Sequence, residues 1–469
     1  MKQYKILFFL FASMLFIVSC DKDFEEINRD PNNPTSIDAH LLLPSTVRMA
    51  QNLIYNAQFG ADLGACWVQH YSKVQYHDES LYFLTRPGVI DAFWNNMYAI
   101  VISDADAMYN LAELEENNNL MAVALTMQAY GYSLLTDVFG DVPFSEALKT
   151  SEGIFSAKYD TQQDVYTGIL ELLTRANSMY GSGDINSTSD ILYGGDAAKW
   201  QKFTNSLKFR ALMRISGKVD VSGQLQALVN QGNMFGSNDD EAKLIYLSAA
   251  PSANPLWETV VDGGRPEYKV NATIVDMMLA NNDPRLPQIA QVNDAGIYRG
   301  KPAGIEGVPN NEYNYSNVSP IGAPYLQAES PGFCMSNAEL LFLMAEAAQK
   351  NYISGSASAL YEAGIAASFE SNNVADNGYI AANFLGALAL EQIGTQKWLA
   401  LYGQGIEAWS EWRRVGYPAL APAIEGVLNH IPTRVSYPDI EASVNSESYE
   451  AAVAAQGTDN LSTPIWWMN

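Results

Sequence analysis

Apolar residues recur every three or four positions in seven stretches of this sequence, the spacing that lines one face of an α-helix. The stretches are residues 93–114, 121–135, 165–179, 200–215, 338–348, 357–367 and 398–412. Strand signals are few, and the best alternating segment, residues 243–247, is short. We therefore predict an all-α fold.

Long segments rich in Gly, Asn, Pro and Ser separate the predicted helices. They cover residues 181–195, 232–240, 248–265 and 295–331, and they are longer than most connections in compact domains. Loops of this kind often carry binding residues. Some predicted helices follow one another after a short turn, which favours helical-hairpin repeats, although no repeat consensus is evident.

The composition is that of a globular, acidic protein. The chain of 469 residues is 48% hydrophobic and 17% charged, so it can bury a large core. Its 27 Lys and Arg residues against 52 Asp and Glu residues give a net charge of -25, spread along the chain. Because this charge repels phosphate groups, we expect no nucleic acid partner. No linker divides the sequence, so we predict one large unit.

The first residues have the pattern of a secretory signal peptide. Lys2 and Lys5 precede an apolar run at residues 6–18, which is too short to span a bilayer stably. The run ends in the sequence FIVSC, which resembles the lipobox of bacterial lipoproteins. The resemblance implies cleavage before Cys20 and lipid on the Cys20 sulfur. An ordinary signal peptide followed by a chance cysteine is the alternative.

This interpretation divides the chain into three parts. They are a lipoprotein signal peptide at 1–19, a lipidated tether at 20–36 and a single helical binding domain at 37–469. Acyl chains on the cysteine would attach the protein firmly to a membrane. Cys66 and Cys334 are the remaining cysteines, and we favour buried free thiols over a single disulfide for them.

The sequence lacks the common signatures of catalysis and metal binding. Its four His residues show no metal-binding spacing, and no phosphate-binding loop or serine nucleophile motif occurs. The most suggestive acid pair is Glu407 and Glu411, one helical turn apart around Trp409, which would suit a glycosidase. Because Arg413 and Arg414 follow directly, we favour an ion-paired helix end instead.

A second acid pair, Asp137 and Asp141, lies in a loop rich in Asp and Gly that leaves a predicted helix. Side chains in such loops commonly cap local backbone groups. A structural calcium ion is the alternative, although the ligand spacing of an EF-hand is missing. We predict no metal-binding residues and no cofactor, with this calcium ion left open.

The segment FEEINRDPNNPT at residues 24–35 resembles the opening of SusD/RagB-family outer-membrane lipoproteins, specifically the SusD-like subgroup. Further blocks with the same resemblance follow in order along nearly the whole chain. They are WNNMY at 94–98, FGDVPFSEAL at 139–148, GDAAKWQKF at 195–203, DPRL at 283–286, AELLF at 338–342, QKW at 396–398, WRR at 412–414 and IPTR at 431–434. Each block is weak alone, but their order and spacing together are specific.

This resemblance implies a non-enzymatic, nutrient-binding lipoprotein of the outer membrane that faces the extracellular side. Such proteins capture oligosaccharides, sometimes peptides, and deliver them to a SusC-like TonB-dependent transporter. Their fold is all-α, with tetratricopeptide-like helical hairpins and long irregular loop insertions that bear the ligand site. A glycoside hydrolase and an adhesive surface lipoprotein are the alternatives.

Most of the matching blocks are expected to build the scaffold; in the stretch 200–215 we expect Arg210 and Arg214 as charges flanking an apolar face. A sugar site needs exposed aromatic faces and planar polar side chains. Aromatic residues with polar neighbours gather between residues 67 and 96, among them Tyr71 and Tyr76, and the resemblance places ligand contacts near a Trp-Asn position. The nominated ligand-binding residues are Tyr82, Trp94, Asn95, Asn96, Trp257 and Tyr325.

Overall fold

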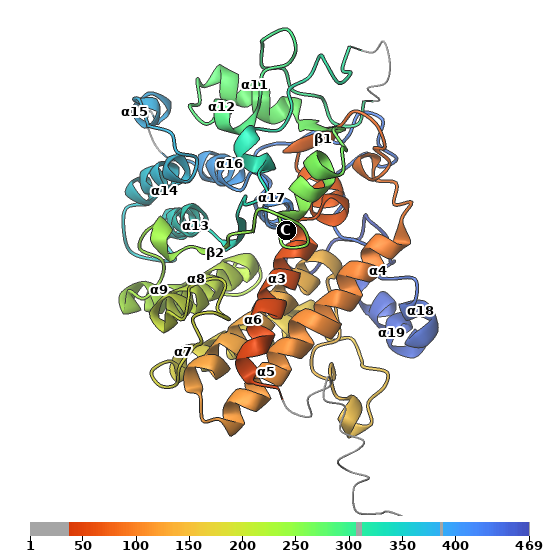
Figure 1. Cartoon of the computed structure of the whole chain (residues 1–469), viewed down its shortest axis with the longest axis vertical. Coiled ribbons are helices and arrows are strands. Elements are labelled where there is room, and N and C mark those ends of the chain that lie inside the picture. Colours follow the sequence, from red (N-terminus) through yellow and green to blue (C-terminus); the bar gives the residue numbers. More distant parts are fainter. Residues whose placement is uncertain (1–36, 306–311, 385–387, 469) are drawn as a thin grey trace, which may run out of the picture.

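The computed structural model describes residues 37–305, 312–384 and 388–468 (Figure 1). The predicted signal peptide at 1–19, the tether at 20–36 and the lipidated Cys20 lie outside these residues. Within the described ranges, no helix is long and apolar enough to cross a membrane.

Helices dominate the described structure. The α-helices are α3 (Leu42–Tyr55), α4 (Pro87–Asn96), α5 (Ser103–Leu114), α6 (Asn118–Phe139), α7 (Gln162–Met179), α8 (Ala197–Ile215), α9 (Ser222–Gln231), α10 (Pro255–Trp257), α11 (Ala272–Ala280), α12 (Leu286–Ile289), α13 (Asn337–Gln349), α14 (Ala357–Ser371), α15 (Tyr379–Asn383), α16 (Leu390–Ala400), α17 (Gly405–Val415), α18 (Glu441–Val444) and α19 (Ser446–Gln456). The π-helical segments are η2 (Ala57–Ala65), η4 (Met97–Ile102) and η7 (Glu258–Asp262). Short 3-10 helices are η1 (Ala39–Leu41), η3 (Glu79–Leu81), η5 (Thr150–Glu152), η6 (Asn238–Asp240) and η8 (Ala323–Leu326).

The described strands are short and form two separate antiparallel pairs. Strand β1 (Tyr71–Lys73) pairs with β3 (Tyr268–Val270), with Tyr71 opposite Val270. Strand β2 (Ala242–Leu244) pairs with β4 (Gly332–Met335), with a register shift next to Ala242. These pairs tie distant loops to the helical body.

Consecutive helices pack against each other, as in helical hairpins. The pairs are α5 with α6, α6 with α7, α7 with α8, and α13 with α14. Figure 1 shows α7, α8, α13 and α14 stacked along one side of the molecule, with α11, α12 and irregular loops above them. The predicted all-α fold of helical hairpins with long loops is confirmed.

Helix α6 lies at the centre of this helical body. It begins after Asn117, whose side-chain oxygen accepts a hydrogen bond from the Leu120 N–H. It ends before Gly140, whose φ of 86° is unfavourable for other residues. Every residue from Asn119 to Phe139 is buried, because α5, α7 and α8 all pack on this helix. A helix that is covered all round needs no polar face.

One predicted helix contains a π-helical segment, and another is wrong in its continuity. The stretch 93–114 is one run of α4, η4 and α5, in which η4 is a π-helical segment. The stretch 398–412 is two helices, α16 and α17, because residues 401–404 form a turn around Gly403 at a φ of 83°. A left-handed backbone position interrupts a helix whatever the apolar spacing.

The charged residues of α17 lie in a buried ion network. The Arg414 guanidinium pairs with Glu346 of α13 at 2.5 Å and with Glu411 at 2.8 Å. Glu411 also pairs with Lys397 of α16 and with Arg214 of α8. The predicted ion-paired helix end is confirmed, and the pairs join four helices.

The structure buries both Arg210 and Arg214, which we expected as charges that flank an apolar face. Arg210 forms a two-pronged pair with Glu339, with both N···O distances at 2.6 Å. Helix α8 is covered by α13 on this side, so a charge there needs a buried partner. Sequence spacing alone does not reveal that partner.

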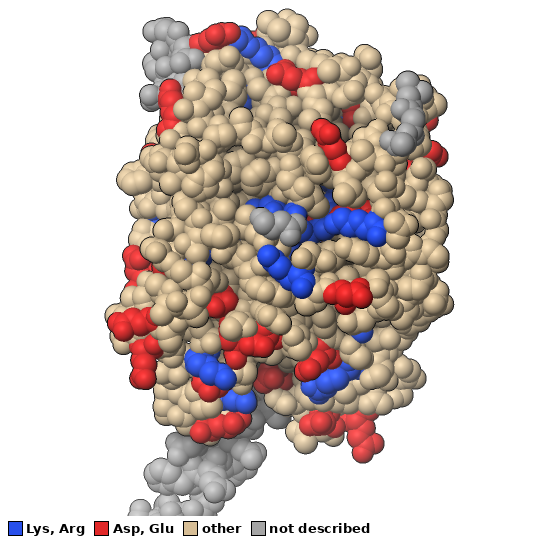
Figure 2. Space-filling model, turned by 180° about the vertical axis from the view of Figure 1, so that it is seen from behind, with Lys and Arg blue, Asp and Glu red and all other residues tan. Residues whose placement is uncertain are grey.

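Acidic side chains are dispersed on the face shown in Figure 2, where basic side chains gather near the middle. Cys66 and Cys334 are free and buried, as favoured from the sequence. Burial raises the pKa of each thiol to about 12, so both stay protonated near neutral pH.

Candidate functional site

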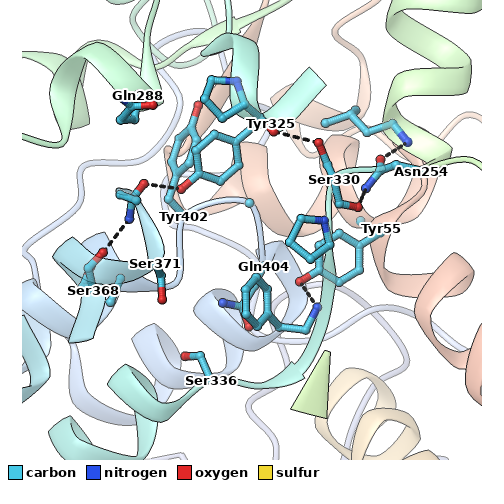
Figure 3. A pocket seen from close by; sticks show the side chains of 18 of the residues that line it. Tyr55, Asn254, Gln288, Tyr325, Ser330, Ser336, Ser368, Ser371, Tyr402 and Gln404 are labelled. Carbon is cyan, nitrogen blue, oxygen red and sulfur yellow. Dashed lines mark hydrogen bonds between the residues drawn. The ribbon is translucent and has the colours of Figure 1, made fainter. Parts of the chain in front are cut away.

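A cavity of about 330 Å³ opens between the helical body and the loops. This volume is within the range of small-molecule sites. Its wall combines the end of α3, the segment η2, the start of α10, the loop around η8, the end of α14 and the turn between α16 and α17. Figure 3 shows Tyr325 and Tyr402 at one side of the cavity and Tyr55, Asn254 and Ser330 at the other.

Aromatic rings form one wall of the cavity. The Tyr325 and Tyr402 rings meet edge to face, with centroids 4.8 Å apart and planes at 90°. Tyr71 of β1 packs on Tyr402 in the same manner at 5.4 Å. The Tyr402 hydroxyl donates to the Ile289 carbonyl oxygen, which fixes the ring. The three rings give the cavity a rigid apolar wall with hydroxyl groups at its edge.

Hydrogen bonds hold many polar groups of the wall in place. The Tyr325 hydroxyl donates to Asn372 Oδ1 at 2.8 Å, and Asn372 Nδ2 donates to the Ser368 carbonyl oxygen (Figure 3). Across the cavity, Asn254 Nδ2 donates to the Ser330 carbonyl oxygen at 3.0 Å. The Tyr55 hydroxyl there accepts the Phe333 N–H. A ligand meets a wall that is already ordered.

Two amide side chains of the wall remain available to a ligand. Gln288 and Gln404 line the cavity, and their side chains make no hydrogen bond with described residues. Gln404 is 8% exposed, so its amide has little access to water outside the cavity. An amide offers both donors and an acceptor, which matches the hydroxyl and amide groups of a sugar.

Charge is absent from the described wall of the cavity: no Asp, Glu, Lys, Arg or His lines it. Burial raises the pKa of the Tyr71, Tyr325 and Tyr402 hydroxyls well above the ordinary value. These hydroxyls are therefore neutral at physiological pH. In a chain with a net charge of -25, this wall favours an uncharged ligand.

A close backbone contact sets the floor of the cavity. A Cβ atom on Gly405 would lie 2.4 Å from the Gly60 oxygen, and one on Gly64 would lie 2.5 Å from the Gly405 carbonyl carbon. The start of α17 therefore touches η2 backbone to backbone. This contact places Gln404 next to Gly60 and Ala61 in the wall.

Of the nominated ligand-binding residues, Tyr325 lines this cavity, as does Tyr71 from the aromatic-rich segment. Trp257 is half-buried at the end of α10, next to the lining residues Asn254 and Leu256, but it does not line the wall itself. The structure thus brings Tyr325 together with Tyr71, which belongs to the aromatic-rich segment.

The structure does not bring the remaining nominees to the cavity. Trp94 is 4% exposed and packs among Phe139, Tyr159 and Tyr437, so its indole presents no free face. Tyr82 is also buried, and its hydroxyl accepts the Ala423 N–H. We therefore leave both out of the candidate site.

The two nominated asparagines lie on α4, away from the cavity wall. Asn95 is exposed, and Asn96 is half-buried. Asn96 Nδ2 donates to the Ala92 carbonyl oxygen one turn earlier. Neither asparagine is among the residues that line the cavity.

Sequence reasoning missed Tyr55, Tyr402 and Gln404. Tyr55 ends α3, whose apolar spacing over residues 43–54 was a usable signal for a helix. Tyr402 and Gln404 fell inside a predicted helix, and only Gly403 between them hinted at a turn. Nothing in the local sequence shows that these residues meet Tyr325.

The acid pairs considered for catalysis or for calcium are engaged by protein groups. Glu407 and Glu411 pair with Arg214, and no carboxylate lines the cavity in the described chain. Asp137 accepts hydrogen bonds from Tyr166 and Trp467, and Asp141 accepts the Gln162 N–H. Capping and ion pairing occupy these carboxylates, so the site does not fit a calcium ion.

One further group, Asp38, His40 and Glu115, places three metal-ligand atoms within 4.8 Å of one another. However, His40 Nδ1 accepts the Asn186 N–H at 3.2 Å. The Nδ1 lone pair of His40 is therefore engaged by a backbone N–H and is not free for a metal. The group does not fit a transition-metal site.

The helical body and the uncharged, aromatic-lined cavity define a ligand-binding protein. Comparison with known proteins adds the family. The family model for SusD-like proteins, described as starch-binding and associating with the outer membrane, matches residues 31–438. The chain belongs to the SusD-like family. No curated protein sequence matches it significantly.

Solved structures show the same fold over nearly the whole chain. A chitin-binding protein is 28% identical, with a TM-score of 0.83, and the match covers 92% of this chain and 100% of that one. A chitin-binding SusD homolog from Flavobacterium johnsoniae is 25% identical, with a TM-score of 0.79 and coverage of 91% and 98%. A SusD homolog from Bacteroides uniformis, at 24% identity, has a TM-score of 0.80 and coverage of 91% and 99%.

Family membership settles the general class of function. The protein is a SusD-like nutrient-binding protein associated with the outer membrane, and proteins of this family associate with SusC transporters. It is a binding protein and not an enzyme. The glycoside hydrolase alternative is thereby excluded.

Proposed function

We propose that the protein is a lipid-anchored receptor on the extracellular side of the outer membrane. It binds an oligosaccharide in the uncharged cavity and delivers it to a SusC-like TonB-dependent transporter. The observation that carries this proposal is the wall itself, which combines the rings of Tyr71, Tyr325 and Tyr402 with the free amides of Gln288 and Gln404. Aromatic faces pack on the apolar faces of sugar rings, and amides bond their hydroxyl groups.

Uncharged N-acetylated sugars are the first ligands to test. Two of the similar solved structures are of chitin-binding proteins. Chitin chains carry hydroxyl and acetamido groups and no charge, which agrees with a wall that has no ionisable side chain other than neutral tyrosines. A charged sugar would lose its hydration in this cavity without gaining an opposite charge.

Calorimetric titration tests the binding step. The mature chain without residues 1–20 is titrated with fragments of chitin, starch and acidic polysaccharides and with short peptides. We expect saturable heat with an uncharged oligosaccharide and no product formation. A signal only with peptides or acidic glycans would contradict the proposed ligand class, and no saturable signal at all would favour an adhesive role.

Protease treatment of intact cells tests the location. We expect the wild-type protein to be digested from outside, and we expect a Cys20→Ala variant to be lost from the membrane fraction because it cannot be acylated. Protection of the wild-type protein would contradict surface exposure. Copurification of an outer-membrane transporter with a tagged form of the protein would support the delivery step.

A further inference from the structure

A second cavity, of about 470 Å³, lies beside the first one. Its wall includes Gln58, Tyr76, Arg86, Glu258 and Arg265. No described residue lines both cavities. The function proposed above does not use this second cavity.

Neighbouring stretches of backbone line the two cavities, and we call residues 56–61 the ridge between them. Residues 56–58 line the second cavity, and Gly60 and Ala61 line the first. In the same way, Pro255 lines the second cavity, and its neighbours Asn254 and Leu256 line the first. Because two residues span at most about 7 Å, the cavities are near neighbours. Gln58 is exposed, so the ridge presents a polar side chain to solvent.

Tyr76 supplies an aromatic face at the mouth of the second cavity. It is 62% exposed, which is unusual for so large an aromatic side chain. Its backbone has a φ of 53°, a conformation that few residues other than glycine adopt. The Arg265 guanidinium lies 5.2 Å from the ring centroid and holds the ring from one side. Strained and exposed residues of this kind concentrate at functional sites.

The charges around the second cavity are largely paired. Arg86 bonds Asp62 and Glu79, each at 2.6 Å, and Arg265 bonds Glu267 at 2.7 Å. The wall therefore offers guanidinium donors without a net positive charge.

Acceptors are present as well. Glu258 lines the second cavity, and its Oε1 atom is buried without a hydrogen-bond partner in the described chain. Three cations, Lys73, Arg86 and Arg265, and three acids, Asp78, Glu79 and Glu258, line the wall, and Asp62 and Glu267 pair with the cations from behind it. Guanidinium donors and carboxylate acceptors side by side can both bond the hydroxyl groups of a sugar.

We propose that the second cavity is a further subsite for the same oligosaccharide that occupies the first cavity. The chain end lies between Tyr325 and Gln404, and the following sugar units cross the ridge at Gln58 and pack on Tyr76. The protein thereby selects chains of several units over single sugars or short fragments. This inference rests on the function proposed above.

A length series tests the inference. Chitobiose and chitohexaose are titrated into the wild-type protein and into Tyr76→Ala and Arg265→Gln variants. Both substituted side chains are at least half exposed, so the variants should fold. Phe155→Ala is the matched control, because Phe155 is 83% exposed and lines neither cavity.

We expect wild type to bind chitohexaose more tightly than chitobiose. In the Tyr76→Ala variant, affinity for chitohexaose should fall on the order of tenfold, with affinity for chitobiose unchanged and Phe155→Ala like wild type. A length preference that persists in both variants would overturn the inference and leave the proposed function intact. If wild type bound another neutral glycan but neither chitin probe, short and long fragments of that glycan would replace chitobiose and chitohexaose in the same test. If wild type bound no glycan, the proposed function and this inference would fail together.

Discussion

Trp94 and Tyr325 are both aromatic residues with polar neighbours in the sequence, yet the fold gives them opposite environments. Trp94 packs on four aromatic rings in the core. Tyr325 is half-buried and borders the cavity. Burial, which the sequence does not display, decides which of the two can meet a ligand.

Alanine substitutions should separate these roles. Tyr325→Ala removes an aromatic face from the cavity, so affinity for a bound oligosaccharide should fall about tenfold with a small change in melting temperature. Trp94→Ala leaves a void in the core, which should cost about 3–5 kcal/mol of unfolding free energy while the folded fraction still binds. Calorimetry measures both quantities. Loss of binding by a fully stable Trp94→Ala variant would contradict the assignment of the cavity.

The neutral wall also predicts how binding depends on pH. No described lining residue titrates near neutral pH, because burial keeps the pKa of Tyr325 and Tyr402 well above its ordinary value. Affinity for an uncharged glycan should stay constant between about pH 5 and 9. Titrations across this range test the prediction, and a steep change in affinity would reveal an ionisable group at the true site.

At the level of secondary structure, the contact of α17 with η2 holds the cavity floor. A Cβ atom on Gly405 would lie 2.3 Å from the Ala65 nitrogen, so Gly405→Ala must push the two segments apart. We expect a loss of about 3 kcal/mol of stability together with weaker binding. The control is Gly223→Ala on α9, where a Cβ meets nothing within 4 Å and should stabilise by about 0.4–1 kcal/mol. Equal melting temperatures for the two variants would contradict this account.

The buried ion network links α8, α13, α16 and α17, and it makes the free energy of unfolding depend on pH in the acidic range. Burial alone would raise the pKa of Glu346, but Arg414 and Lys397 hold it well below the ordinary value of 4.5. A carboxylate with a lowered folded pKa stabilises the fold above its unfolded pKa, and this stabilisation is lost as pH falls below it. Each pH unit below about 4.5 should cost about 1.4 kcal/mol per such group.

Thermal unfolding from pH 7 to pH 3 checks this dependence. The melting temperature of wild type should be level near neutral pH and should fall steeply in acid. Glu346→Gln should unfold earlier at pH 7, because Arg414 loses its buried partner, and its decline in acid should be shallower. Parallel curves for wild type and variant would show that Glu346 does not carry the acid sensitivity.

The spacing of apolar residues in the sequence predicts most helices of the body but few residues of the candidate site. The predicted stretches 165–179 and 357–367 lie within α7 and α14, since a one-sided apolar face is a local property. The break between α16 and α17 depends on the left-handed backbone of Gly403 and on the contact of Gly405 with η2, and that contact is not local in sequence. That break is what places Tyr402 and Gln404 in the cavity.

At the scale of the whole molecule, the residues that line the cavity range from Ile54 to Gln404. Helices and loops that are far apart in the sequence pack together to form its wall. No single segment carries a recognisable sugar-binding motif, so the site follows from the fold and not from a local pattern. The family resemblance, in contrast, rests on sequence blocks spread over the chain, and the family model accordingly matches residues 31–438.

A crystal structure of the protein with a bound chitin oligosaccharide tests the central claim most directly. The account predicts a sugar ring beside Tyr325 and Tyr402 with a hydrogen bond to Gln404, and further units over the ridge toward Tyr76. A glycan bound at Asn95 and Asn96 on α4, with the cavity empty, would contradict it.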